Sequence, residues 1–356
     1  MDIEFKLFDP NGITREDWNK IHEYRMERHH ENPDDSILSD EVYEKAILQD
    51  YKNDSIYIRR YLIIDSQKSK QIGYMTILAS SEKDPSYEMN KSLLYFNLAI
   101  LKDFRKKGIA TKSMEYLLDF AKKHNSMLAQ TRSSEEDGFK FLKKIGANLA
   151  RSEKEARLQM KDVDWDMIKR WVSEAKLLNP NTKIVRFTRV PDEIIDQYSK
   201  VCTETFNQMP MDNLEQNAMI ITPEFLRNNE KEFNELGSTI NSLITVEQDN
   251  QISAMTEMVY NPEKKTMISQ HLTGVRNKYR GRKLGKWIKG LMLLDMKEKY
   301  PEVTIATTTT ADSNASMLSI NNRLGYKPFK ESVTAQIKLD DLEKYYSSKA
   351  HLAHQS

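Results

Sequence analysis

Residues 98–125, LAILKDFRKKGIATKSMEYLLDFAKKHN, decide the predicted fold of this chain. An apolar run leads into a basic turn that contains Gly108, and an amphipathic helix follows. Four apolar residues recur at helical spacing and share one face of that helix: Met114, Leu117, Leu118 and Ala121. A strand that enters a helix through a glycine turn offers unpaired N–H groups and the positive end of the helix dipole to an anion. The stretch therefore predicts a strand–turn–helix unit that binds phosphate.

The same arrangement returns in residues 275–300, VRNKYRGRKLGKWIKGLMLLDMKEKY, after an expected strand at 267–275. The apolar stripe of this second helix consists of Leu284, Ile288, Leu291 and Leu294. The second turn differs at one position, where Lys283 stands in the place of Gly108. Because a Cβ atom limits positive φ and the approach of a phosphate, we expect the second turn to bind more weakly or with a slightly different geometry.

Other short segments repeat in the same order. A strand is expected at 4–8 and again at 183–187, and Lys-Ile-Gly-Ala at 144–147 has the counterpart Arg-Leu-Gly-Tyr at 323–326. A repeat of this length indicates a duplicated domain rather than a solenoid. Strands alternate with helices in both halves, which favours a mixed α/β sheet in each.

The composition limits the classes of protein that fit. A chain of 356 residues exceeds one comfortable hydrophobic core, so two domains are expected. Hydrophobic residues make up 39% of the chain and charged residues 30%, which is typical of soluble globular domains. The net charge of +1 provides no overall field for nucleic acid or an anionic membrane, and no apolar run is long enough to span a bilayer.

The cysteine and histidine content argues against a disulfide framework and a metal site. Cys202 is the single cysteine of the chain, and its place in an apolar helical stripe predicts a buried structural thiol. His29 and His30 are adjacent, which is not the spacing of zinc ligands. The N-terminus is acidic where a signal peptide would be basic, so the sequence predicts a cytoplasmic protein without a metal.

The six residues 105–110 read R-x-x-G-x-A directly after a strand. This pattern resembles the acetyl-CoA pyrophosphate loop of the GNAT acetyltransferases, Q/R-x-x-G-x-G/A, and residues 280–285 fit it except at Lys283. Residues 314–326 resemble the last block of that family, N-x-x-A…Y-x-x-x-G-F. The resemblance covers nearly the whole chain, and the stretch that joins residues 209–212 to the second loop looks like the tandem GNAT acetyltransferases, the broad group that includes mycothiol synthase.

The resemblance implies an α/β fold (α+β, with a mixed sheet) of two tandem GNAT-like domains. Each would be a twisted, mostly antiparallel sheet with helices on both faces. The repeat places the N-terminal domain at 1–162, a connecting helix and linker at 163–181, and the C-terminal domain at 182–345. Residues 346–356 lack core periodicity and are expected to form a flexible tail.

The resemblance also implies acetyl-CoA as the co-substrate, with its pantetheine arm in a gap between two strands and its pyrophosphate on the loop. A backbone N–H near Val275 or Ile100 would stabilise the oxyanion. The residues expected to bind the cofactor are Ile100, Arg105, Lys106, Lys107, Gly108, Ile109, Ala110 and Thr111 in the first half, and Val275, Arg280, Gly281, Arg282, Lys283, Leu284, Gly285, Lys286 and Asn314 in the second.

Acetyl transfer to an amine benefits from a general base, because an amine with a pKa of about 10.4 must lose a proton. Family bases lie on the strand before the loop, where the second half has Ser269 and, two residues later, His271. Glu257 on the neighbouring strand is the other candidate. The usual tyrosine acid of the family maps to Asn321.

The first half offers no titratable residue at these places. Its two base positions are Leu94 and Phe96, and its tyrosine position is Leu142. We therefore expect the chemistry in the second half. Tyr326 is assigned to the core, and the irregular segment 209–221 is expected to shape the acceptor pocket.

The sequence thus predicts an N-acetyltransferase whose acceptor is a primary amine of a small molecule or a peptide, with neither nucleic acid nor membrane as a partner. It leaves the oligomeric state open. A non-catalytic acyl-CoA-binding or regulatory protein remains the alternative, because the family's glutamate and both tyrosines are missing and Lys283 replaces a glycine.

Overall fold

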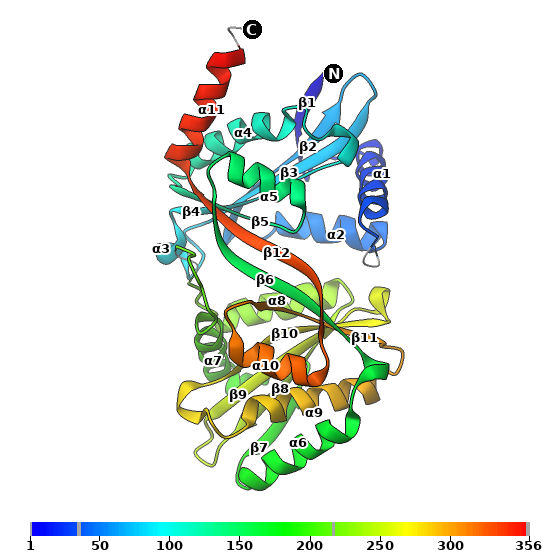
Figure 1. Cartoon of the computed structure of the whole chain (residues 1–356), viewed down its shortest axis with the longest axis vertical. Helices are drawn as coiled ribbons and strands as arrows, with labels where there is room; N and C mark the ends of the chain where they lie inside the picture. Colours follow the sequence, from blue (N-terminus) through cyan, green and yellow to red (C-terminus); the bar gives the residue numbers. More distant parts are fainter. Residues whose placement is uncertain (1, 34–36, 216–217, 354–356) are drawn as a thin grey trace. The chain divides into compact units, whose positions relative to one another are not determined.

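The computed structural model describes residues 2–33, 37–215 and 218–353, and these divide by their contacts into two compact units (Figure 1). Unit 1 contains residues 2–33, 37–151, 213–215 and 333–353. Unit 2 contains residues 152–212 and 218–332. The chain passes between the units within two long strands, β6 (Asn148–Gln159) and β12 (Lys327–Lys338).

Unit 1 is built on a sheet with the strand order β1-β2-β3-β4-β5-β12. Only β4 and β5 run parallel, and the other neighbours that pair within the unit are antiparallel. Its elements, besides the part of β12 that it contains, are β1 (Ile3–Leu7), α1 (Arg15–Glu31), α2 (Asp40–Asp50), β2 (Ile56–Asp65), β3 (Lys70–Ser80), α3 (Tyr87–Asn90), β4 (Leu93–Ile100), η1 (Lys102–Phe104), α4 (Ile109–Lys123), β5 (Leu128–Ser133), α5 (Glu136–Lys144) and α11 (Leu339–Ala353).

Helices cover both faces of this sheet. On one face, Met114 and Leu117 of α4 pack with Leu94 of β4 in a buried cluster. On the other face, Trp18 of α1 packs with Leu62 of β2. Helix α1 begins after Thr14, whose side chain caps it in a reciprocal capping box with Asp17.

Unit 2 repeats this plan with the strand order β6-β11-β10-β9-β8-β7, in which only β10 and β11 run parallel. Its elements, besides its parts of β6 and β12, are η2 (Met160–Asp162), α6 (Trp165–Leu178), β7 (Lys183–Phe187), η3 (Asp192–Ile194), α7 (Ile195–Asn207), α8 (Pro223–Glu235), β8 (Thr239–Val246), β9 (Ile252–Tyr260), η4 (Pro262–Lys264), β10 (Met267–Val275), η5 (Asn277–Tyr279), α9 (Leu284–Lys299), β11 (Ile305–Ala311) and α10 (Ala315–Leu324).

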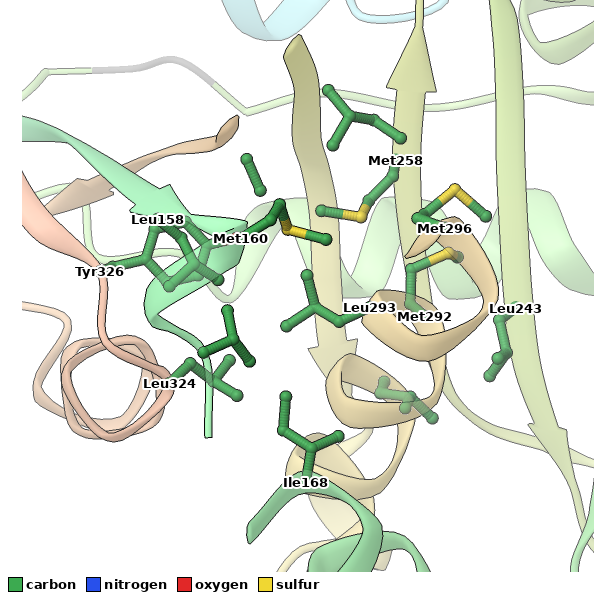
Figure 2. Close-up of a cluster of buried hydrophobic side chains, with 14 of the residues drawn as sticks. Leu158, Met160, Ile168, Leu243, Met258, Met292, Leu293, Met296, Leu324 and Tyr326 are labelled. Atoms are coloured by element: carbon green, nitrogen blue, oxygen red, sulfur yellow. The ribbon is translucent and has the colours of Figure 1, made fainter. Parts of the chain in front are cut away.

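The main core of unit 2 lies between its sheet and helices α6 and α9. Figure 2 shows Met258 of β9 on the same side as Met292 and Leu293 of α9, with Ile168 of α6 completing the layer. Tyr326 is a buried member of this cluster, as expected. A second cluster, around the fully buried Tyr198 of α7, covers the opposite face and includes Cys202, so the prediction of a buried thiol is confirmed.

Each unit is completed by a strand and a helix from the other half of the sequence. Strand β5 pairs with β12, whose helix α11 packs Leu342 into the core of unit 1. Strand β11 pairs with β6, whose helix α6 packs Ile168 against Gly290 of α9. The boundaries expected from the repeat, 162/163 and 181/182, therefore differ from the edges of the compact units.

Two further expectations can be compared with the elements. The mixed α/β fold with a tandem, mostly antiparallel arrangement is confirmed. The segment expected to be a flexible tail, 346–356, begins within helix α11, which extends to Ala353 and whose first turn places Leu339 and Leu342 in a buried cluster. Residues 354–356 lie outside the described residues. Within the described ranges, no helix is both long and apolar enough to cross a membrane.

Candidate functional site

The two predicted phosphate turns have the same backbone conformation. In loop 1 (residues 105–110), Lys106 has φ 59° and Gly108 has φ 81°. In loop 2 (residues 280–285), Gly281 has φ 83° and Lys283 has φ 61°. The second and fourth positions are therefore left-handed in both loops, with glycine and lysine exchanged. The replacement of the fourth glycine by Lys283 does not change the path of the backbone.

The first arginine closes each loop onto the end of the preceding strand. Nε of Arg105 donates to the carbonyl of Ile100 at 2.9 Å, and Nε of Arg280 donates to the carbonyl of Val275 at 3.4 Å. A short 3-10 helix precedes each arginine, η1 in unit 1 and η5 in unit 2. Both arginines therefore stabilise the loop conformation through a hydrogen bond to the preceding strand.

Each loop ends at a helix N-terminus that no side chain caps, α4 after Gly108 and α9 after Lys283. The N–H groups of a first helical turn have no acceptor within the helix, and the dipole favours negative charge there. Alternating left-handed residues also turn successive N–H groups toward one concavity. Both loops are therefore suited to hold a diphosphate.

The electrostatic surroundings of the two loops differ. In loop 1 the guanidinium of Arg105 is paired with Glu135 at 2.6 Å and Asp137 at 3.3 Å, so much of its charge is neutralised. In loop 2 the guanidinium of Arg280 donates to the neutral amide of Gln208 at 2.8 Å. The first arginine of loop 2 consequently keeps its charge for an anionic ligand, although Arg282 and Lys283 are paired with Glu247 and Glu174.

In both units the strand before the loop separates from its parallel neighbour. Strands β4 and β5 are paired only from Leu93 to Tyr95, and β10 and β11 only from Met267 to Ser269. Beyond these points β4 and β10 continue along their antiparallel partners, so a gap opens on the other side. In unit 1 a cavity of about 260 Å³ lies at this point, with Asn97 and Gln130 in its lining.

The strand before loop 2 contains a β-bulge that the strand before loop 1 lacks. The register of β10 on β9 shifts between Gln270 and Thr273, so that His271 and Leu272 lie opposite Glu257 alone. Strand β4 pairs with β3 without interruption. A bulge re-aims side chains and removes a residue from the ladder, and it occurs frequently beside active sites.

Glu257 and His271 contact helices on the same face of the sheet. The hydroxyl of Tyr198 in α7 donates to Oε1 of Glu257 at 2.6 Å, and the ring of Phe233 in α8 lies edge-on to His271 at 5.9 Å. Loss of hydration raises the pKa of Glu257 above its ordinary value, and Glu230 adds to this. His271 is exposed, but its neighbours remove part of its hydration and lower its pKa.

A buried lysine takes part in the polar packing around Asn321, and sequence reasoning missed it. Nζ of Lys289 in α9 donates to Oδ1 of Asn321 at 2.8 Å, and Nδ2 of Asn321 donates to Oγ1 of Thr310 at 3.1 Å. Lys289 is 1% exposed, and burial among neutral partners lowers its pKa to about 7. Its position directly after Ile288, in an otherwise apolar stretch of α9, is the feature of the sequence that could have indicated a buried lysine.

The other predicted site residues have local roles as well. Lys107 lies over the ring of Phe104 at 5.1 Å, and Arg282 binds Asn179, Thr182 and Glu247. The first helical residues, Ile109 and Leu284, are buried, whereas Ala110, Thr111, Gly285 and Lys286 are partly exposed. The side chain of Asn314 caps its own helix, α10, by accepting from the N–H of Met317.

The segment expected to shape the acceptor pocket is divided between the units. Met219 and Ile221 are held on α7 in unit 2, where Asn207 bonds Met219 and Thr203 bonds Ile221. Glu215 belongs to unit 1, where its N–H donates to Gln336 at 2.8 Å. Residues 216–217 lie outside the described residues.

Comparisons with known proteins agree with this geometry. Residues 18–147 match the sequence model of the acetyltransferase (GNAT) family. A tandem GNAT protein from the clavulanic acid biosynthesis pathway, solved without AcCoA, is similar in structure with a TM-score of 0.73 and 15% identity, over 95% of this chain and 99% of that chain. A comparison with curated proteins finds none that matches the chain in sequence.

Two further structures share the fold. A GCN5-related N-acetyltransferase from Sphaerobacter thermophilus has a TM-score of 0.62 and 14% identity over 95% of this chain and 96% of that chain. The N-myristoyltransferase of Saccharomyces cerevisiae with bound myristoyl-CoA has a TM-score of 0.54 and 10% identity over 94% of this chain and 80% of that chain. Residues 18–147 therefore match the GNAT acetyltransferase family in sequence, and the chain as a whole has the tandem GNAT fold.

Proposed function

We propose that the chain is an acetyl-CoA-dependent N-acetyltransferase that moves an acetyl group directly to a primary amine of a small molecule or peptide. We place the chemistry in unit 2. The observation that carries this choice is the bulge of β10, because it sets His271 opposite Glu257 where β10 and β11 separate.

The arrangement supplies the two things that acetyl transfer to an amine needs. A carboxyl with a raised pKa, Glu257, is a general base poised closer to neutral pH than an ordinary glutamate. The hydroxyl of Tyr198 holds it in place. A backbone N–H near Val275 would stabilise the oxyanion, and the thiolate of the donor, with a pKa of about 8.5, leaves with little help.

His271 is the second candidate for the base. It reaches the same face of the sheet, and its lowered pKa keeps the imidazole neutral near pH 7. If the amine loses its proton to His271, the His271→Ala variant loses more activity than Glu257→Gln. If Glu257 takes the proton, the order is reversed.

Matched loop variants test where the chemistry occurs. Ala110 and Gly285 occupy the same position, in the uncapped first turn of α4 and α9. An aspartate there suits the helix dipole, so both folds should survive, but its charge repels a diphosphate. We expect acetyl-CoA turnover with a panel of amines to fall at least about tenfold further in Gly285→Asp than in Ala110→Asp. Equal losses, or a larger loss in Ala110→Asp, would place the chemistry elsewhere.

One observation favours the alternative, a non-catalytic acyl-CoA-binding or regulatory protein. Asn321, at the tyrosine position of the family, is 2% exposed and engaged with Lys289 and Thr310. Calorimetric binding of CoA, combined with no release of free CoA from acetyl-CoA across the amine panel, would support this alternative over the enzyme.

A further inference from the structure

A hollow in unit 2 lies directly beside loop 2, where α9 lies between α6 and α10 (Figure 1). It has a volume of about 260 Å³. Six residues line it: Arg170, Trp171 and Glu174 from α6, Lys283 and Lys286 from loop 2 and α9, and Arg323 from α10. We call this hollow the α6 pocket.

The α6 pocket is strongly positive. Four of its six lining side chains are cations, and Glu174 is the single carboxylate among them, at 3.1 Å from Nζ of Lys283. Burial and then the charges of Arg323 and Lys283 lower the pKa of Lys286. The cations thus repel one another in the structure, and an anion bound between them would relieve that repulsion.

The pocket also has an aromatic wall. Trp171 is partly buried, and Nζ of Lys286 lies 5.2 Å from the centre of its ring. An indole face beside a cluster of cations suits a planar heterocycle that carries phosphate, because stacking and charge pairing then act on the same ligand.

Lys283 connects the α6 pocket to the anion cradle of loop 2. It is the N-cap residue of α9 and also lines the pocket. A ligand with its diphosphate on loop 2 therefore has its next groups within reach of Lys286 and Arg323.

We propose that the α6 pocket binds the 3′-phosphate and adenine of the CoA nucleotide, with the phosphate among Arg170, Lys286 and Arg323 and the adenine against Trp171. This proposal rests on the function proposed above, because it needs the diphosphate of CoA on loop 2. Helix α6, expected from the sequence to be a connection between domains, thereby becomes part of the cofactor site.

Unit 1 lacks two of the three corresponding cations. The counterparts of Lys283 and Lys286 are the neutral Gly108 and Thr111, and only Arg323 has a charged counterpart, Lys144. We therefore expect recognition of the 3′-phosphate to be a property of unit 2.

Calorimetry on the full chain tests the proposal. The background is Ala110→Asp, in which the cradle of loop 1 is blocked, and the ligands are CoA and dephospho-CoA. We expect CoA to bind about 10- to 100-fold more tightly than dephospho-CoA, as charge-assisted bonds to one phosphate allow. Arg170→Gln and Arg323→Gln should each reduce this ratio several-fold and leave the affinity for dephospho-CoA unchanged.

Lys169→Gln is the matched control, since Lys169 neighbours Arg170 on α6 and is likewise exposed and paired with an aspartate, but does not line the α6 pocket. It should leave the ratio unchanged. Equal affinities for CoA and dephospho-CoA, or a ratio that Arg170→Gln, Arg323→Gln and Lys169→Gln affect alike, would overturn the α6 pocket while the proposed function stands. Failure of both ligands to bind would instead overturn the proposed function.

Discussion

Loop 1 and loop 2 reach one backbone conformation with glycine and lysine in opposite places. Lys106 precedes Gly108 in loop 1, whereas Gly281 precedes Lys283 in loop 2, and all four residues are left-handed. A left-handed lysine costs on the order of 1 kcal/mol relative to glycine, so each loop bears this cost once. The two loops therefore share the same backbone conformation but differ in their charge.

The strands that lead into the two loops also differ from each other. Strand β4 is regular, and β10 is bulged opposite Glu257. The helices after the loops differ too, because Met114 in α4 has Lys289 as its counterpart in α9, and both are buried. Unit 2 thus has polar or titratable residues at positions where unit 1 has apolar ones.

The largest expected effect concerns the exchanged elements. A fragment of residues 1–162 contains loop 1 but lacks β12 and α11, and with them the buried Ala335, Ile337, Leu339 and Leu342. Burial of such side chains contributes about 1.5–3 kcal/mol each for the larger ones, which together approach the whole stability of a domain. We expect this fragment to be unfolded or aggregated by circular dichroism and size-exclusion chromatography.

Co-expression provides the control for this fragment. Residues 1–162 and 163–356 produced together should assemble into a soluble complex, since all strands are then present. A monomeric, cooperatively unfolding 1–162 fragment would show that the compact units do not govern folding.

The next effect tests the bulged strand. Glu257→Gln keeps the shape and the bond from Tyr198 but removes the base, so kcat/KM should fall about 100-fold or more. Because the pKa of Glu257 is raised, the rate of the parent protein should rise with pH above the ordinary carboxyl range, and this limb should vanish in the variant. Asn97→Ala, at the gap in unit 1, should change kcat/KM less than about threefold.

A third prediction concerns the buried lysine. The folded-state pKa of Lys289 is about 7 against an ordinary value of 10.5, so the folded protein binds fewer protons than the unfolded chain between these values. The destabilisation that comes from burying the charged side chain of Lys289 is therefore full below about pH 7 and decreases as the pH rises toward 10.5. Unit 1 has methionine, Met114, at the corresponding position. The substitution Lys289→Met should therefore raise the free energy of unfolding by about 2 kcal/mol or more at pH 6.5.

Denaturant unfolding at pH 6.5 and pH 10 measures this effect. The gain should shrink at the higher pH. If the gain in unfolding free energy were independent of pH, packing rather than the buried charge would explain why methionine is more stabilising than lysine at position 289.

The smallest effect concerns the left-handed lysines. Lys106→Gly and Lys283→Gly should each raise the free energy of unfolding by about 0.5–1 kcal/mol, because glycine adopts positive φ without strain. The ion pair of Lys283 with Glu174 is largely exposed and offsets little of this gain. Thermal unfolding of the two variants should show shifts of the same sign, and a loss in Lys283→Gly alone would mean that its side chain supports the α6 pocket.

The sequence by itself determined the tandem organisation, the strand–turn–helix loops and the apolar faces of α4 and α7. Each of these depends on residues close together in the chain: the helical period of Met114, Leu117 and Leu118, the R-x-x-G-x-A spacing of loop 1, and the repeat of both in the second half. Local periodicity and turn chemistry suffice to read them.

Only the tertiary structure decided which half completes each sheet, where β10 bulges, that Lys289 is buried, and that α6 lines a charged pocket. These features join residues far apart in the chain, such as Arg170 with Arg323 and Glu257 with Tyr198. Their stability comes from burial and charge among those partners, and no local pattern of the sequence records it.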